Sequence, residues 1–469
     1  MVFASLIFLF LFLPLNLFLY YLSGNQMYRN VLLIIFSFFF YSWGEPVWIL
    51  VMIFSATVDY LNAIVIERNR GTVWAKAGLI SSLVVNLGLL FLFKYSGFFY
   101  QTLNQWFGLS LEVPSFAFPI GISFYTFQTI SYVVDVYRSE VKAQYSYMKY
   151  FLFVSLYHQL VAGPIVRYAH IAHEIENRQT SIKDISNGVN RFCIGLFKKV
   201  FFANVAGELV KQYLDADLTS LSTGGAWFGL LMFSLQIYFD FSGYSDMAIG
   251  LGWMFGFHYH ENFNYPYIAK TATEFWRRWH ISLSTFFRDY LYIPLGGNQH
   301  NGFRNLIIVW FLTGLWHGAS WNFILWGLYF GMLIGLERIW LKALLDRIPT
   351  AFSHFYLVLA AMIGWAIFYF TDLERLGTFI SVLSGFAQQP LWNNVVSIDF
   401  MSHLYWLLAA LICCLPVYHY VNRWINERFH PSLSGNLTLA YTGLNVVILL
   451  ISVSMLVGKS YNPFLYFRF

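Results

Sequence analysis

Long apolar stretches recur from one end of the chain to the other, and they limit its fold more than any other feature. Only 11% of the 469 residues are charged, whereas 58% are hydrophobic. A soluble domain carries about 25% charged residues, so this chain has too few charges to cover a surface in water. Runs of about 20 apolar residues cross a bilayer as helices. The sequence therefore predicts an all-α polytopic membrane protein with one membrane domain over residues 1–469.

The candidate spans differ in length. The first lacks the basic region and small-residue cleavage site of a signal peptide, so we expect it to be retained. Several others are too short for a full crossing and are expected to be tilted or re-entrant, which leaves about ten to twelve true crossings. The candidate spans are residues 2–22, 30–43, 46–66, 77–95, 117–136, 148–165, 190–207, 226–256, 304–317, 320–340, 355–371, 403–421 and 437–457.

Basic residues in the loops predict the orientation, because Lys and Arg concentrate on the cytoplasmic side of a membrane. The basic loops 67–76 and 338–347 are expected to be cytoplasmic, and so is 257–303, as an interfacial amphipathic region. The segment 376–402 contains no Lys or Arg and is placed outside. Since the chain changes side at each crossing, the spans that follow place the aromatic C-terminal tail, 458–469, outside as well.

The net charge and the cysteines argue against a nucleic-acid partner and against a metal site. The net charge of +5 is spread among loops, so it indicates membrane topology and contact with membrane lipids, and no nucleic-acid partner is expected. Cys193, Cys413 and Cys414 lack the spacing of a metal or redox motif, and no metal site is expected. The adjacent cysteines lie in an apolar run and are predicted to be packing residues.

The segment 304–340 is apolar between two basic flanks and is predicted to be a re-entrant hairpin. Its first arm, from Asn305 to Trp316, would rise only about 18 Å as a helix, against about 30 Å of hydrocarbon. The small residues Gly314 and Gly318 provide a break at its end. This geometry places His317 at the tip of the hairpin, near the bilayer midplane.

His317 is the first candidate catalytic residue, because an ionisable side chain inside a membrane is costly and is functional by default. Histidine suits acyl transfer, since its pKa near 6.5 lets it accept and return a proton at neutral pH. The alternative is that His317 only hydrogen-bonds to neighbouring helices.

A second cluster interleaves charges and tryptophans at helical spacing within 257–303. Arg277, Arg278 and Arg288 would face lipid headgroups if this segment lies in the membrane interface. They would equally suit the phosphates of an acyl-coenzyme A donor or an acidic carrier protein. Both interpretations stay open. An interfacial helix does not account for His280, and residues 262–267 are predicted to form a turn.

Two carboxylates, Asp240 and Asp246, lie in a long apolar stretch with Gly243 between them. Paired buried acids would carry protons or ions in a transporter. We favour a structural role, in which they fix helix ends and neighbouring hydroxyl groups.

The C-terminal tail is rich in aromatic residues, which are poorly suited to stay in water. We expect it to dock in a groove, since chain ends are otherwise disordered. Tyr466 adds a hydroxyl group that could accept an acyl group. The alternative is an interfacial aromatic anchor.

Five motifs in this order resemble the membrane-bound O-acyltransferases, specifically the bacterial branch that includes the alginate O-acetylation membrane protein and the D-alanyl transfer protein of teichoic acid synthesis. The resemblance covers nearly the full length, and no motif position departs from the family pattern. The motifs are Pro119–Tyr125, Leu160–Arg167, Tyr238–Gly252, Glu274–Ser284 and Gly314–Ala319.

The resemblance implies a helical bundle with a central tunnel that opens on both sides of a bacterial inner membrane. It aligns His317 with the invariant histidine of the family and His280 with the second one. It implies an acyl thioester such as acetyl-coenzyme A as the cytoplasmic donor substrate, with no permanently bound cofactor. It also implies an external or periplasmic SGNH-like acetyltransferase partner with a Ser-His-Asp site, within a polysaccharide synthesis and export complex.

The same resemblance implies a second role for the tail, because a similar aromatic motif occurs at the C-terminus in this branch. The resulting hypothesis is a relay in which His317 activates Tyr466, which takes the acyl group from the donor and presents it outside. Three alternatives remain: transfer of another group such as D-alanine, a transporter using Asp240, Asp246 and His317, and a scaffold for a polymer-export complex.

Overall fold

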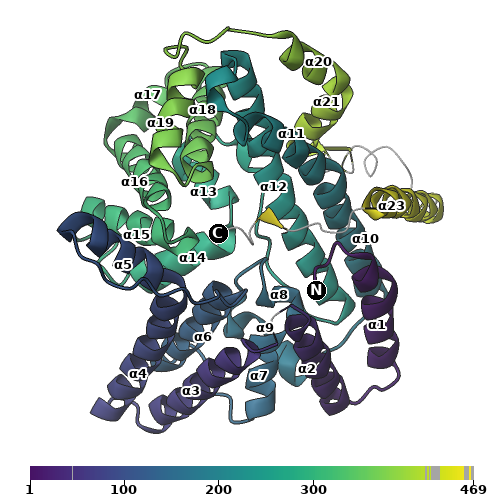
Figure 1. Cartoon of the computed structure of the whole chain (residues 1–469). Coiled ribbons are helices and arrows are strands. Elements are labelled where there is room, and N and C mark those ends of the chain that lie inside the picture. The colour runs from purple at the N-terminus through teal and green to yellow at the C-terminus, as the bar shows by residue number, and fades with distance from the viewer. Residues whose placement is uncertain (45, 418–419, 422, 424–433, 459–463, 466–469) are drawn as a thin grey trace. The chain divides into compact units, whose positions relative to one another are not determined.

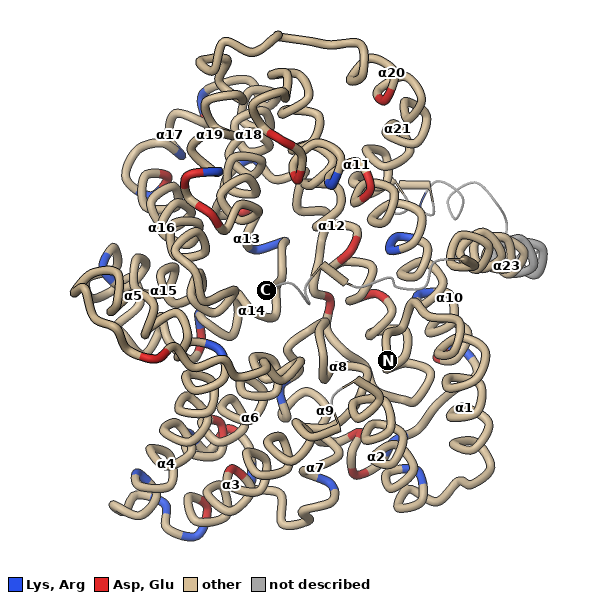
Figure 2. The backbone as a smooth tube through the Cα atoms, viewed as in Figure 1, with Lys and Arg blue, Asp and Glu red and all other residues tan. Residues whose placement is uncertain are grey.

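The computed structural model describes residues 1–44, 46–417, 420, 421, 423, 434–458, 464 and 465 (Figure 1). All regular elements that it describes are helices, which confirms the predicted all-α class. Lys, Arg, Asp and Glu residues lie mainly in loops and near helix ends (Figure 2).

The chain forms two compact units, each assembled from separate segments. The first unit comprises Met1–Phe192, Tyr244–Glu261 and Thr285–Leu291, and the second comprises Cys193–Gly243, Asn262–Ser284 and Tyr292–Phe469.

The first unit contains η1 (Phe8–Phe12), α1 (Leu13–Tyr21), α2 (Gln26–Ser42), α3 (Ile49–Arg68), α4 (Val73–Leu90), η2 (Phe91–Tyr95), α5 (Ser96–Phe107), α6 (Ile122–Tyr137), α7 (Tyr147–Ser155), α8 (Tyr157–Leu160) and α9 (Tyr168–Glu176). Residues of both units belong to α10 (Ile182–Phe197), α12 (Thr223–Met254), α14 (Ile281–Phe287) and η6 (Arg288–Tyr292). The second unit contains η3 (Lys198–Ala203), α11 (Asn204–Leu214), η4 (Leu218–Ser220), η5 (Pro266–Ile268), α13 (Ala272–Arg278), α15 (Gly302–His317), α16 (Trp321–Leu336), η7 (Glu337–Leu341), α17 (Lys342–Leu345), α18 (Thr350–Tyr369), α19 (Leu373–Leu383), α20 (Asn394–Ser402), α21 (Leu404–Cys413) and α23 (Ser434–Leu456).

Among the residues that the structure describes, four helical segments are long and apolar enough to cross a membrane, and the chain is a multi-pass membrane protein. They are Ile49–Arg68, Val73–Phe107, Trp321–Leu345 and Thr350–Tyr369. The bent pair α20 and α21, which meet at 61°, makes a fifth if it is one span. The expected ten to twelve crossings also include shorter helices, such as Phe8–Tyr21, and that count stays a prediction.

The predicted hairpin is present as the helices α15 and α16, joined by the three residues from Gly318 to Ser320. A Cβ on Gly314 would lie 2.2 Å from the Phe323 carbonyl oxygen, and one on Gly327 would lie 2.2 Å from the Trp310 carbonyl oxygen. Glycine at both positions therefore lets the two backbones touch.

The two arms of this hairpin differ in length. The first arm has 16 residues and rises about 24 Å, whereas the second continues through η7 and α17 into a 25-residue segment. Re-entrance of the hairpin and the midplane depth of its tip stay predictions.

Three of the five sequence motifs pack together in the first unit. Gly121 precedes α6 with a φ of +80°, and a Cβ there would lie 2.6 Å from the Leu160 carbonyl oxygen. A Cβ on Gly163 would lie 3.3 Å from the Ala248 side chain and 3.5 Å from the Tyr244 ring. The first two motifs therefore pack against each other, and the second packs against the third.

The cysteines are only partly as predicted. Cys193 and Cys414 are buried, but Cys413 is exposed. The expectation that both adjacent cysteines are packing residues is wrong for Cys413, because neighbouring residues on a helix point in different directions.

A buried polar network joins α3, α4 and α6 in the first unit. Asp59 accepts hydrogen bonds from Ser82 Oγ at 2.5 Å and from Asn86 Nδ2 at 2.9 and 2.8 Å. The side-chain oxygen of Asn86, Oδ1, in turn accepts from Ser55 Oγ at 2.7 Å and from Thr129 Oγ1 at 3.4 Å. All five side chains are at most 1% exposed, so the network satisfies polar groups that water does not reach.

We predict that Asp59→Ala destabilises the fold, because it leaves the Ser82 and Asn86 donors without their acceptor. One buried group left unsatisfied costs about 1–3 kcal/mol. The midpoint of thermal unfolding in detergent should fall clearly below that of the matched variant Leu61→Ala, whose side chain is 55% exposed on the same helix. Equal midpoints for the two variants would contradict the role of the network.

Candidate active site

His317 is the last residue of α15, and it is 7% exposed. Aromatic rings enclose its imidazole: the ring centroids of Trp326 in α16, Phe368 in α18 and Trp316 in α15 lie 4.8, 5.3 and 4.9 Å away. A histidine in such surroundings is held in one orientation and kept from bulk water. Proton transfer to it is then limited to groups brought into this pocket of rings.

Local contacts determine where the helix with His317 ends. Gly318 has extended backbone angles, and a Cβ there would lie 2.2 Å from the Phe323 ring. Asn322 donates hydrogen bonds to the carbonyl oxygens of Ile367, at 3.2 Å, and Phe368, at 3.0 Å. These carbonyls lie at the C-terminal end of α18, where the helix leaves them unsatisfied. Asn322 thereby helps to hold the Phe368 ring against His317.

His280 lies in the same unit and is 1% exposed. It follows α13 with a φ of +44°, a strained conformation for a residue with a side chain. Its ring centroid lies 4.7 Å from that of Phe241 and 6.0 Å from that of Trp316, the residue before His317. The structure therefore brings the two predicted histidines to the same tryptophan.

The side chain of Asn262 determines the tautomer of His280. Its Oδ1 accepts hydrogen bonds from Ser282 N–H at 3.2 Å and Ser282 Oγ at 2.9 Å, and it lies 3.1 Å from His280 Nδ1. Because a backbone N–H only donates, this atom is an acceptor and the proton of His280 sits on Nδ1. The lone pair of the neutral ring is therefore on Nε2.

Burial lowers the pKa of His280 to about 3, so the ring is neutral at cellular pH. Within the described part of the chain, Nε2 is buried and has no hydrogen-bond partner. A buried acceptor of this kind is costly unless a ligand or water satisfies it. His280 is thus suited to accept a hydrogen bond from a substrate group.

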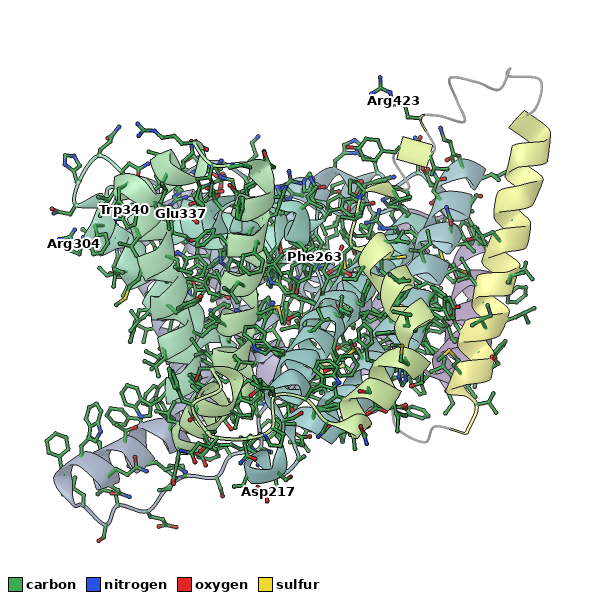
Figure 3. All side chains as sticks on the ribbon, turned by 90° about the horizontal axis from the view of Figure 1, so that it is seen from above. Asp217, Phe263, Arg304, Glu337, Trp340 and Arg423 are labelled. Carbon is green, nitrogen blue, oxygen red and sulfur yellow. The ribbon has the colours of Figure 1, made fainter. Side chains whose placement is uncertain are left out.

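Glu337 orients the helix that leads to His280, and sequence reasoning missed it. The carboxylate accepts hydrogen bonds from the N–H groups of Ala272 at 2.6 Å and Thr273 at 2.9 Å, at the start of α13. These N–H groups have no partner inside the helix, and a carboxylate also suits the positive end of its dipole. Glu337 follows α16, so the second arm of the hairpin holds α13. Figure 3 labels Glu337 in the view with all described side chains.

The three predicted donor-binding arginines are divided between the two units. Arg278 donates to Glu274 at 2.9 Å and to the Asn264 carbonyl oxygen at 3.1 Å, whereas Arg277 is exposed. Arg288 belongs to the first unit, where its Nε donates to Asp289 at 2.6 Å. Donor binding by these arginines stays a prediction.

Arg167 also donates to Asp289, at 2.7 Å. Burial favours the neutral form of Asp289, but the hydrogen bonds from Arg288 and Arg167 outweigh it and hold the pKa below its usual range. The ionised Asp289 therefore partly neutralises Arg288, a pairing that the spacing in the sequence did not predict.

The two acidic residues of the third motif are ion-paired, which the sequence did not predict. Asp240 lies 2.5 Å from Lys199 Nζ, and Asp246 lies 2.7 Å from Arg191, which also binds Glu261. Tyr466 lies outside the described residues. Within the part of the chain that is described, no group of three His, Cys, Asp or Glu side chains is arranged to hold a metal ion.

The sequence model of the membrane-bound O-acyltransferase family matches residues 2–379. The chain belongs to this family. It is thus an acyltransferase, and the resemblance read from the five motifs is confirmed. Because the family model covers most of the chain, the family assignment agrees with the helical fold and with the predicted enzyme class.

Curated relatives of this membrane-bound O-acyltransferase cover most or all of the chain. A probable alginate O-acetylase of Pseudomonas aeruginosa is 43% identical over 80% of this chain and 73% of its own length. One of Pseudomonas putida is 38% identical over the whole of both chains. A peptidoglycan O-acetyltransferase of Helicobacter pylori is 31% identical over all of this chain and 98% of its own.

We predict that Asn262→Leu lowers acyl transfer by about 10- to 100-fold, since the His280 proton is then free to move to Nε2. Asn262→Asp keeps an oxygen acceptor for Nδ1 and should retain more activity. The measurement is acyl transfer by membranes that contain equal amounts of each variant. Equal losses in the two variants would show that Asn262 only packs.

We also predict that His280 contributes to acid sensitivity. Its pKa is about 3 in the folded protein and about 6.5 when unfolded, so below pH 6.5 the unfolded chain binds a proton that the folded one does not. Stability is retained above pH 6.5 and falls toward pH 3, with a loss of about 2 kcal/mol at pH 5. His280→Gln should show a smaller fall in its unfolding midpoint between pH 7.5 and 5. Parallel curves would contradict this.

Proposed function

We propose that this enzyme moves an acetyl group from a cytoplasmic acyl thioester, such as acetyl-coenzyme A, across a bacterial inner membrane for O-acetylation of an exopolysaccharide. His317 is the general base. The observation that carries this proposal is the burial of His317 among aromatic rings. A second buried histidine, His280, lies 6.0 Å from the Trp316 ring, and its Nε2 has no hydrogen-bond partner among the described residues.

The relatives support acetyl as the group and a polysaccharide as its destination. Two of them are named for alginate and one for peptidoglycan, and all three names specify O-acetylation. The higher identity of the alginate pair makes an alginate-like polymer the first candidate acceptor.

The transfer step needs a hydroxyl nucleophile and a thioester. His317 takes the hydroxyl proton as the oxygen attacks the thioester carbonyl carbon, the C–S bond breaks, and the departing thiolate receives the proton from His317. The neutral His280 orients the reactants by accepting a hydrogen bond at Nε2. The aromatic surroundings limit competing hydrolysis because they exclude water.

The first acceptor hydroxyl in this proposal is that of Tyr466, which then presents the acetyl group outside. A phenol with a pKa near 10 needs a base at neutral pH, and its ester is reactive enough to pass the group on. Arg277, Arg278 and Arg288 remain candidates for the donor phosphates. An SGNH-like acetyltransferase outside, within a polysaccharide synthesis and export complex, would complete the modification of the polymer.

The ion pairs weigh against the transporter hypothesis. A proton path needs carboxylates that change charge, whereas Asp240 and Asp246 are each held by a cation. A scaffold would not need two histidines around one tryptophan. Transfer of D-alanine instead of acetyl remains an outcome for the experiment to detect.

His317→Ala should reduce the O-acetyl content of the polymer at least about 100-fold, because loss of a general base costs that much. The measurement compares cells that carry equal membrane levels of the variant and of His300→Ala, which removes an exposed histidine of the same unit. The control should keep wild-type acetylation. Retained acetylation in His317→Ala would remove this histidine from the mechanism, and D-alanine found on the polymer would change the transferred group.

A further inference from the structure

The described end of the C-terminal tail is buried in the second unit. Phe464 is 1% exposed and Leu465 is 8% exposed, and Leu465 belongs to the hydrophobic core of that unit. A chain end stays ordered only where something docks it. The expected docking of the tail is therefore observed for these two residues.

The docking contacts are polar as well as apolar. The Leu465 N–H donates a hydrogen bond to Asp240 Oδ2 at 2.5 Å. The other carboxylate oxygen, Oδ1, lies 2.5 Å from Lys199 Nζ, which in turn lies 4.8 Å from the centroid of the Phe464 ring. Both members of the ion pair thus contact the tail, the carboxylate through a backbone N–H and the ammonium through an aromatic face.

Burial makes this ion pair costly unless further groups complete it. The side chains of Lys199 and Asp240 are each 4% exposed. Removing two charges from water is repaid only if additional hydrogen bonds satisfy them. Leu465 N–H and the Phe464 ring supply such contacts, and both come from the same two residues of the tail.

We propose that the Lys199–Asp240 pair is the docking site of the C-terminal segment and positions the residue after Leu465. That residue is Tyr466. Asp240, in the third motif, and Lys199, in η3, are then positioning residues for the proposed relay. The docking stands on the described contacts, and its catalytic meaning rests on the proposed relay through Tyr466.

The alternative is that the pair only joins η3 to α12. The double variant Lys199→Asp with Asp240→Lys separates the two roles. It keeps opposite charges facing each other, but it places an ammonium group where the Leu465 N–H needs an acceptor. Asp240→Asn is the matched variant, because its amide oxygen can still accept that hydrogen bond.

The test measures how fast a carboxypeptidase shortens the purified full-length protein in detergent, with intact mass spectrometry as the readout. Docking predicts that digestion of the wild type and of Asp240→Asn stops before Leu465. The double variant should be digested past Phe464 at least about ten times faster, with its unfolding midpoint close to that of the wild type. Equal protection in the double variant would overturn the docking site.

Polymer acetylation in the same variants tests the positioning, with Tyr466→Phe as the reference. If positioning holds, the double variant loses acetylation together with tail protection, as Tyr466→Phe does without loss of protection. A released tail with full acetylation, while Tyr466→Phe is inactive, would overturn positioning. Full acetylation in Tyr466→Phe would overturn the relay and leave the docking result intact.

Discussion

The interior of a bilayer contains no water, so each polar group buried in this chain depends on a partner inside the protein. Asp59 is surrounded by hydroxyl and amide donors, and Asp240 shares its two oxygens between Lys199 and a backbone N–H. Glu337 satisfies the first N–H groups of α13. Such contacts are directional, whereas apolar packing is not, so they determine which helices meet and at what register.

The same constraint builds the candidate site. His280 is buried and neutral, and Asn262 holds its proton on Nδ1. The other ring nitrogen, Nε2, is therefore a buried acceptor without a hydrogen-bond partner among the described residues. His317 is surrounded by aromatic rings on helices that glycines bring into contact. The proposed transfer of an acyl group without hydrolysis requires a base that is shielded from water and an acceptor of fixed orientation.

Parts of this site were predictable because their signal is local. His317 ends an apolar arm that is too short to cross a bilayer, and Gly314 and Gly318 beside it indicate a break. The roles of Asn262 and Glu337 were not predictable, since each acts on residues far away in the sequence. Asn262 lay in a segment read only as a turn. The T-x-x-E pattern from Thr271 to Glu274 marks the start of α13 in the structure, but it gives no sign of the Glu337 carboxylate that caps the helix.

The sequence by itself determined that this protein is an all-α membrane protein of one acyltransferase family, because apolar run length and motif order need no partner to be read. Only the tertiary structure decided which charges neutralise one another and which nitrogen of His280 is left as an acceptor without a hydrogen-bond partner among the described residues. Lys199 and Asp240, or His280 and Asn262, meet only after several helices have packed. Their pairing depends on the relative rotation and register of those helices, which spacing along one chain does not specify.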